Sequence, residues 1–99
     1  MTYQNIEALG QLLGCYFHQD WTDEFDSDEA AFQVIVDSEP KERLLAGVKE
    51  IDALLAASLP EDELRSLMAE SAGCYFDPGS EGLTYEQWLK RARQKFAQA

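Results

Sequence analysis

The residue best suited to acid–base chemistry at neutral pH is His18, the only histidine of the chain. It lies two residues before Asp20, and a carboxylate that orients an imidazole can make it a general base. A histidine that hydrogen-bonds locally and holds the neighbouring loop is the simpler interpretation, and we favour it. Cys15 and Cys74 would both need a nearby base to act as nucleophiles, and only one histidine is available.

An acidic run follows the histidine and could in principle bind a cation. Its carboxylates do not match a calcium-binding loop, because the turn glycine and the terminal glutamate are missing. No glycine-rich phosphate loop and no nucleophile elbow occurs elsewhere. The sequence therefore predicts a protein that is not an enzyme, with no catalytic residue, no metal site and no cofactor.

Charge is unevenly distributed along the chain. Nineteen acidic and eight basic residues give a net charge of −11, and residues 1–40 contain nine of the acids and no Lys or Arg. Nucleic acids and anionic membranes need a positive footprint, so neither is expected as a direct partner. Solubility alone could explain the net charge but would not require the asymmetry. The asymmetry predicts a surface that binds a cationic protein.

The acidic run supplies the candidate contact residues for such a partner. Asp20, Asp23, Glu24 and Asp26 have no local role that the sequence shows, whereas Asp28 and Glu29 complement the dipole at a predicted helix start. Trp21 and Phe25, within the run, are more consistent with core than with a contact, because large aromatic side chains are usually buried. The predicted contact residues are Asp20, Asp23, Glu24, Asp26, Asp28 and Glu29.

The spacing of apolar residues at three and four positions predicts the elements that hold these side chains. Five helices are expected, over residues 4–17, 27–37, 40–58, 60–73 and 84 onward, with a strand through 34–36 as an alternative to part of the second. Residues 18–27 have no period and predict an acidic connection, and residues 74–83 predict a loop. The fold class is all-α, with a single compact domain over residues 1–99.

Local signals mark several helix ends. Asp26 or Ser27 can cap the second helix, Gly73 is suited to end the fourth, and Thr84 with Gln87 forms a capping box. Gly10 and Gly14 disfavour the first helix, unless they admit a close neighbour. The tetrapeptide Gly-Cys-Tyr-Phe occurs at 14–17 and again at 73–76, which is too short a match to establish a duplication.

Targeting signals are not apparent. The first ten residues lack the basic and apolar regions of a signal peptide, and no run approaches the roughly 20 apolar residues that span a bilayer. We therefore expect a cytoplasmic protein with reduced cysteines that behave as small hydrophobic side chains.

The stretch Leu-Gly-Cys-Tyr-Phe-His-Gln-Asp-Trp at 13–21 resembles the signature of one group of immunity proteins from bacterial contact-dependent growth inhibition systems. In that group a Tyr-Phe-His-Gln-Asp-Trp core follows the first helix, and an acidic segment comes next. The Gly-Cys-Tyr-Phe-Asp-Pro turn at 73–78 and the Thr-x-x-x-Trp-Leu start at 84–89 agree with it. The resemblance spans most of the chain.

The resemblance implies a binding module that neutralises the C-terminal toxin domain of a cognate CdiA-type effector in a one-to-one complex. It further implies a nuclease toxin, similar to ribonucleases, whose active site the immunity protein covers. A ribonuclease must present positive charge to phosphate, so an acidic surface would compete for the same groove. The signature residues are then scaffold: Tyr16, Phe17, His18, Gln19 and Trp21.

Three other functions remain open from the residues. The first is an acidic adaptor or regulatory subunit unrelated to a toxin. The second is a small enzyme that uses His18 with Asp20. The third is a nucleic-acid mimic, which would need acids spaced like phosphates over one long face, unlike the clustered run.

Overall fold

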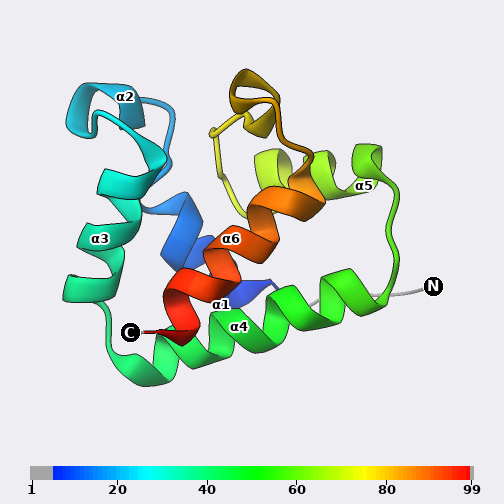
Figure 1. Cartoon of the computed structure of the whole chain (residues 1–99), viewed down its shortest axis with the longest axis horizontal. Helices are drawn as coiled ribbons and strands as arrows, with labels where there is room; N and C mark the ends of the chain where they lie inside the picture. The colour runs from blue at the N-terminus through cyan, green and yellow to red at the C-terminus, as the bar shows by residue number, and fades with distance from the viewer. Residues whose placement is uncertain (1–5, 99) are drawn as a thin grey trace.

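The computed structural model describes residues 6–98, which form helices around one apolar core (Figure 1). Two π-helical turns, η1 (Gly10–Gly14) and η2 (Leu67–Ser71), extend the first and fifth helices, and a 3-10 turn, η3 (Pro78–Glu81), precedes the last. The α-helices are α1 (Glu7–Leu9), α2 (Trp21–Glu24), α3 (Asp28–Ser38), α4 (Lys41–Ala56), α5 (Glu61–Ser66) and α6 (Tyr85–Ala97). The all-α prediction is confirmed, and the alternative strand at 34–36 is wrong because those residues lie within α3.

The structure has six α-helices over residues 6–98 where five were predicted, because α2 lies in the stretch expected to be an irregular connection. This helix is a single turn, too short to display an apolar period. The Trp21 N–H donates to the His18 carbonyl at 2.9 Å, and the Phe25 N–H donates to the Trp21 carbonyl at 2.9 Å. Pro40 and Pro60 precede α4 and α5 instead of beginning them. Gln4, the expected start of the first helix, lies outside the described residues.

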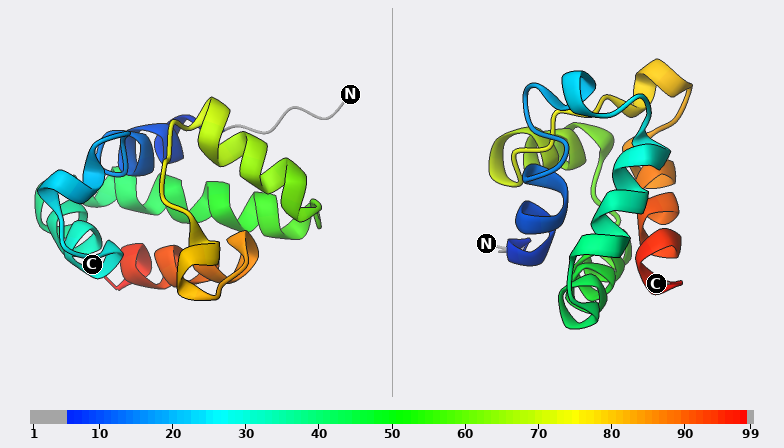
Figure 2. Two further views of the ribbon diagram at one scale, coloured as in Figure 1. Left: turned by 90° about the horizontal axis from the view of Figure 1, so that it is seen from above. Right: turned by 90° about the vertical axis from the view of Figure 1, so that its left-hand side faces the viewer.

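The long helix α4 is the centre of the packing. It contacts α1 on one side and α6 on the other, and the view from above in Figure 2 shows it between the two. Helix α6 also contacts α3 and α5. Helices α1, α3, α4, α5 and α6 can therefore each bury apolar side chains against at least one neighbour, which stabilises short helices that would be marginal alone.

Aromatic rings form the middle of the core. The Phe17 ring is fully buried, with its centroid 5.3 Å from that of Trp88, 5.4 Å from that of Phe32 and 5.7 Å from that of Phe76. Phe76 stacks on Trp88 at 4.6 Å. These rings come from four segments of the chain, so the core joins both halves of the sequence.

The two Gly-Cys-Tyr-Phe copies lie side by side. The Tyr75 N–H donates to the Phe17 carbonyl at 2.7 Å, and the backbone of Ala72 packs directly on Gly14. A Cβ atom at Gly14 would overlap the Ala72 carbonyl oxygen. The expected role of Gly14, to admit a close neighbour, is therefore confirmed, and the neighbour is the end of η2.

The structure contains the helix caps that the sequence predicts and two more that it does not predict. Ser27 accepts from the Ala30 N–H at 3.2 Å, Thr84 and Gln87 form the expected capping box, and Gly73 has φ +72 just after η2. In addition, Glu50 of α4 accepts from two N–H groups of α1, and Glu61 of α5 accepts from two N–H groups of α6. Carboxylates suit these positions because helix N-termini carry unpaired N–H groups and partial positive charge.

No helix within residues 6–98 has the length and apolar character needed to cross a bilayer.

Candidate partner-binding surface

The acidic run forms an exposed turn at the upper edge of the molecule in Figure 1. Asp20, Asp23 and Asp26 are exposed, and their carboxylates have no hydrogen-bond or ion-pair partner within residues 6–98. Glu24 is also exposed and pairs with His18. We call these four residues, Asp20, Asp23, Glu24 and Asp26, the α2 acidic surface.

His18 holds this turn by local hydrogen bonds. Its Nδ1 accepts from the Asp20 N–H at 3.1 Å, and its Nε2 lies 2.9 Å from Glu24 Oε2. The main chain of Asp20, and not its carboxylate, contacts the ring. The predicted structural role of the histidine is confirmed, and the alternative general-base arrangement with the Asp20 carboxylate is not formed. The neighbouring Gln19 is exposed.

Trp21 and Phe25 attach the turn to the core. Both are half-buried and pack against it, and the Trp21 ring lies 5.3 Å from Phe17 and 5.4 Å from Phe76 between centroids. Both residues therefore pack against the core, as the core interpretation predicts, and keep part of their surface exposed. Trp21 and Phe25 therefore attach the turn to the core, while Asp23 and Glu24 of α2 are exposed.

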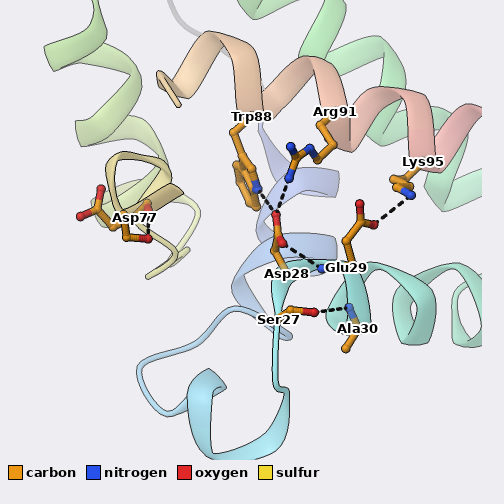
Figure 3. A network of polar contacts seen from close by, with 9 residues as sticks. Ser27, Asp28, Glu29, Ala30, Asp77, Trp88, Arg91 and Lys95 are labelled. Carbon is orange, nitrogen blue, oxygen red and sulfur yellow. Dashed lines mark hydrogen bonds and ion pairs between the residues drawn. The ribbon is translucent and has the colours of Figure 1, made fainter. Parts of the chain in front are cut away.

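Asp28 does not belong to the exposed surface. Its side chain is 5% exposed, and Oδ2 accepts from Trp88 Nε1 at 3.0 Å and from Arg91 at 3.3 Å (Figure 3). Its other oxygen accepts from the Glu29 N–H at 3.0 Å. The first turn of α3 points this carboxylate toward α6, so it cannot reach a partner. We remove Asp28 from the predicted contact residues.

Glu29 lies on the solvent side of the same turn but is already paired. Its carboxylate is 2.9 Å from the Lys95 ammonium of α6, and the side chain is 52% exposed (Figure 3). An exposed ion pair of this kind contributes little to stability. Glu29 can therefore reach a partner only at the margin of the surface, where it would exchange Lys95 for another cation.

Most other acids near a base are neutralised locally. Glu39 pairs with Arg43, Asp52 with Arg93, and Glu86 with Lys90. The acids of α2 differ because no Lys or Arg lies in residues 18–27, and the structure brings none to them within residues 6–98. Within the α2 acidic surface, Glu24 pairs with His18, and the three aspartates form a concentration of negative charge that the described part of the fold leaves unpaired.

Comparison with known proteins identifies the family of this chain. The family model described as the CdiI immunity protein matches residues 5–96. The chain belongs to the CdiI immunity protein family. It is thus an immunity protein of contact-dependent growth inhibition and not an enzyme, which confirms the resemblance found in the sequence.

Among solved structures, the chain is similar to one from Y. kristensenii 33638 described as a crystal structure of a CdiA-CT/CdiI complex. The two chains share 34% sequence identity and a TM-score of 0.82, over 90% of this chain and 95% of that one. No curated protein matches this CdiI family member.

The signature residue Tyr16 ties the first helical segment of this immunity protein to the junction of α3 and α4. Its hydroxyl donates to Glu39 at 2.6 Å, and Arg43 donates to the other carboxylate oxygen at 2.7 Å. The hydrogen bond to the Glu39 carboxylate raises the pKa of Tyr16, and the Tyr16 and Arg43 donors lower the pKa of Glu39. Tyr16 therefore contacts Glu39, which lies outside the acidic run, and the contact joins two parts of the fold.

The two cysteines differ in accessibility. Cys74 is 1% exposed, and burial raises the pKa of its thiol to about 12, whereas Cys15 is exposed. Both cysteines are free thiols, and Cys74 packs as the expected small hydrophobic side chain, whereas Cys15 is exposed on the turn after η1. No group of three or more His, Cys, Asp or Glu side chains within residues 6–98 is arranged to hold a metal ion.

This difference predicts the thiol chemistry of the folded protein. We expect a disulfide reagent such as Ellman's reagent to react promptly with one thiol per chain at pH 8, because only a thiolate that solvent reaches can attack it. Cys15→Ser should abolish the prompt reaction, and Cys74→Ser should leave it unchanged. Prompt labelling of Cys74 in the folded Cys15→Ser variant would contradict the burial.

Proposed function

We propose that this immunity protein neutralises a cationic toxin domain, the C-terminal domain of its cognate CdiA-type effector, by placing the α2 acidic surface over a positively charged active site. The toxin in this proposal is a nuclease, because an enzyme that binds phosphate must present positive charge. The complex is a one-to-one heterodimer formed in the cytoplasm of the producing cell, and inhibition results from exclusion of the nucleic acid.

The observation that carries the proposal is the unpaired state of Asp20, Asp23 and Asp26. Like charges placed close together repel one another, and this fold supplies no cation to offset the repulsion. A partner with basic side chains would offset it on binding, and would be drawn to the surface before contact. The relative from Y. kristensenii is described in a complex with CdiA-CT, which supports a toxin domain as that partner.

The alternative of an acidic adaptor unrelated to a toxin has less support. Nothing in residues 6–98 favours a second partner over a toxin domain, and the family is one of immunity proteins. The nucleic-acid mimic is also disfavoured, because the acids of the α2 acidic surface gather around one helical turn instead of following a long face.

The experiment is charge reversal of the α2 acidic surface. We expect Asp23→Lys, Glu24→Lys and Asp26→Lys together to slow association with the cognate toxin domain at low salt by roughly 10- to 100-fold, because electrostatic steering raises association rates by such factors. Surface plasmon resonance or stopped-flow fluorescence measures the association rate constant, and raising the salt concentration should shrink the difference between variant and wild type.

The matched control changes the same number of charges elsewhere. Glu42, Asp62 and Glu63 are exposed on α4 and α5, and their carboxylates also have no hydrogen-bond or ion-pair partner in the described part of the chain. Glu42→Lys, Asp62→Lys and Glu63→Lys therefore give an equal change of net charge. If position matters, the control slows association much less. Equal slowing in both variants would reduce the effect to net charge, and no slowing in the α2 variant would exclude α2 from the interface. A toxin domain without nuclease activity would refute the nuclease part of the proposal.

A further inference from the structure

Tyr75 is the most exposed large apolar side chain among residues 6–98. It is 55% exposed, compared with 43% for Leu45 and 39% for Val34. Its neighbours Cys74 and Phe76 are 1% and 3% exposed, so Tyr75 is the outward member of an alternating extended run. Its hydroxyl makes no hydrogen bond within the described residues. Tyr75 therefore has no evident role in holding the fold.

The backbone that carries Tyr75 is nevertheless held firmly on both sides. Its own N–H donates to the Phe17 carbonyl at 2.7 Å, and the next ring, Phe76, stacks on Trp88 at 4.6 Å. An aromatic side chain on a fixed backbone loses little conformational entropy on binding, since only two torsion angles remain free. Tyrosine at such a position is among the residues most often found to dominate binding energy.

The surroundings of Tyr75 define the charge of what could cover it. The Phe76 ring lies 5.4 Å from the ring of Trp21, the first residue of α2, and the Tyr75 N–H donates to the Phe17 carbonyl, so the backbone run that carries Tyr75 passes beside the segment that leads into α2. On the other side, Asp77 and Glu81 flank and end the turn η3, and both are exposed. Figure 1 and the right-hand view in Figure 2 place α2 and η3 along the same upper edge of the molecule.

Neither segment contributes a compensating cation. Residues 18–27 and 74–83 together contain six acids and no Lys or Arg. An exposed ring on a run that passes beside one acidic segment and leads into another fits a partner that brings basic side chains around an apolar or guanidinium contact. It does not fit an acidic partner, and it disfavours a second copy of this acidic chain docked through the same end.

We infer that Tyr75 is the anchor of the toxin-binding surface, and that this surface is composite, formed by α2 together with the distant run 75–81. The inference rests on the proposed function. It assigns the association rate to α2 and the dissociation rate to the run 75–81. The acids of α2 set how fast the cationic toxin domain arrives, and the Tyr75 ring sets how long it stays.

The test compares Tyr75→Ala with Leu45→Ala, which removes the next most exposed apolar side chain from another helix, α4. We expect Tyr75→Ala to raise the dissociation rate constant for the cognate toxin domain about 30-fold or more, as truncation of an interface hot spot does. The association rate constant should stay near wild type because no charge changes. Tyr75→Phe should retain most of the affinity if the ring face provides the contact, and Leu45→Ala should match wild type.

Thermal unfolding monitored by circular dichroism confirms that each variant is folded, as expected for exposed positions. A wild-type dissociation rate in folded Tyr75→Ala would overturn the inference, and so would equal effects of Tyr75→Ala and Leu45→Ala. Concentration-dependent self-association that Tyr75→Ala abolishes, with toxin affinity unchanged, would assign the ring to a second copy and also overturn it. If the α2 charge reversal slows association while Tyr75→Ala has no effect, the proposed function stands and only this inference fails.

Discussion

Replacing Gly14 with Ala is expected to lower the free energy of unfolding by about 3 kcal/mol or more, the upper part of the range for overpacked sites. The added Cβ would overlap the carbonyl oxygen of Ala72 and come within 3.2 Å of its carbonyl carbon. Both atoms belong to the main chain, so no flexible side chain can turn aside. The segment after η2 must then move away from η1, which also strains the hydrogen bond between Tyr75 and Phe17.

Gly10→Ala provides the matched control for this prediction. Gly10 lies in the same π-helical turn, but a Cβ there would be 3.9 Å from the Ala72 oxygen, an ordinary contact distance. Alanine is a better helix former than glycine, so this variant should be neutral or gain up to about 1 kcal/mol. Urea denaturation monitored by circular dichroism measures both. A Gly14→Ala variant as stable as wild type would mean that the two Gly-Cys-Tyr-Phe copies do not pack this closely.

The second large effect is expected at Asp28. Asp28→Ala should lower the free energy of unfolding by about 3 kcal/mol, because removal of one partner leaves buried polar groups unsatisfied. The Trp88 indole N–H would lose its acceptor inside the core, and Arg91 would lose the carboxylate that holds it. The contact between α3 and α6 depends on this carboxylate.

Glu29→Ala is the natural comparison, since it removes the adjacent acid from the same helical turn. Its ion pair with Lys95 is exposed, so the expected loss is below about 1 kcal/mol. Chemical denaturation of the two variants under identical conditions tests the difference. Similar stability losses for Asp28→Ala and Glu29→Ala would contradict the division of this acidic pair into an interior and a surface residue.

These predictions follow from a division of the acids that net charge does not reveal. Some carboxylates are structural: Asp28 binds Trp88 and Arg91, and Glu50 and Glu61 cap helices that belong to other parts of the chain. Others form exposed ion pairs of small energetic value. Asp20, Asp23 and Asp26 have no such contact to lose within residues 6–98, and they make up most of the α2 acidic surface.

The fold class, most helix positions and the family could be predicted from residue types and their spacing. Apolar spacing and caps such as Thr84 with Gln87 act between residues a few positions apart, so they can be read from a linear pattern. The single turn of α2 escaped the pattern because four residues cannot show a period. The family signature likewise occupies one continuous stretch at 13–21.

The burial of each residue in the acidic run, and its contacts with distant segments, could be read only from the packing of the helices. Asp28 and Asp23 are the same residue type in one acidic run. Asp28 accepts a hydrogen bond from Trp88, 60 positions away, whereas Asp23 is exposed to solvent. In the same way, the Tyr75 N–H donates to the Phe17 carbonyl of a segment far away in the sequence. Such pairings depend on how helices are oriented when their apolar faces pack together, and residue spacing within one segment carries no record of that orientation.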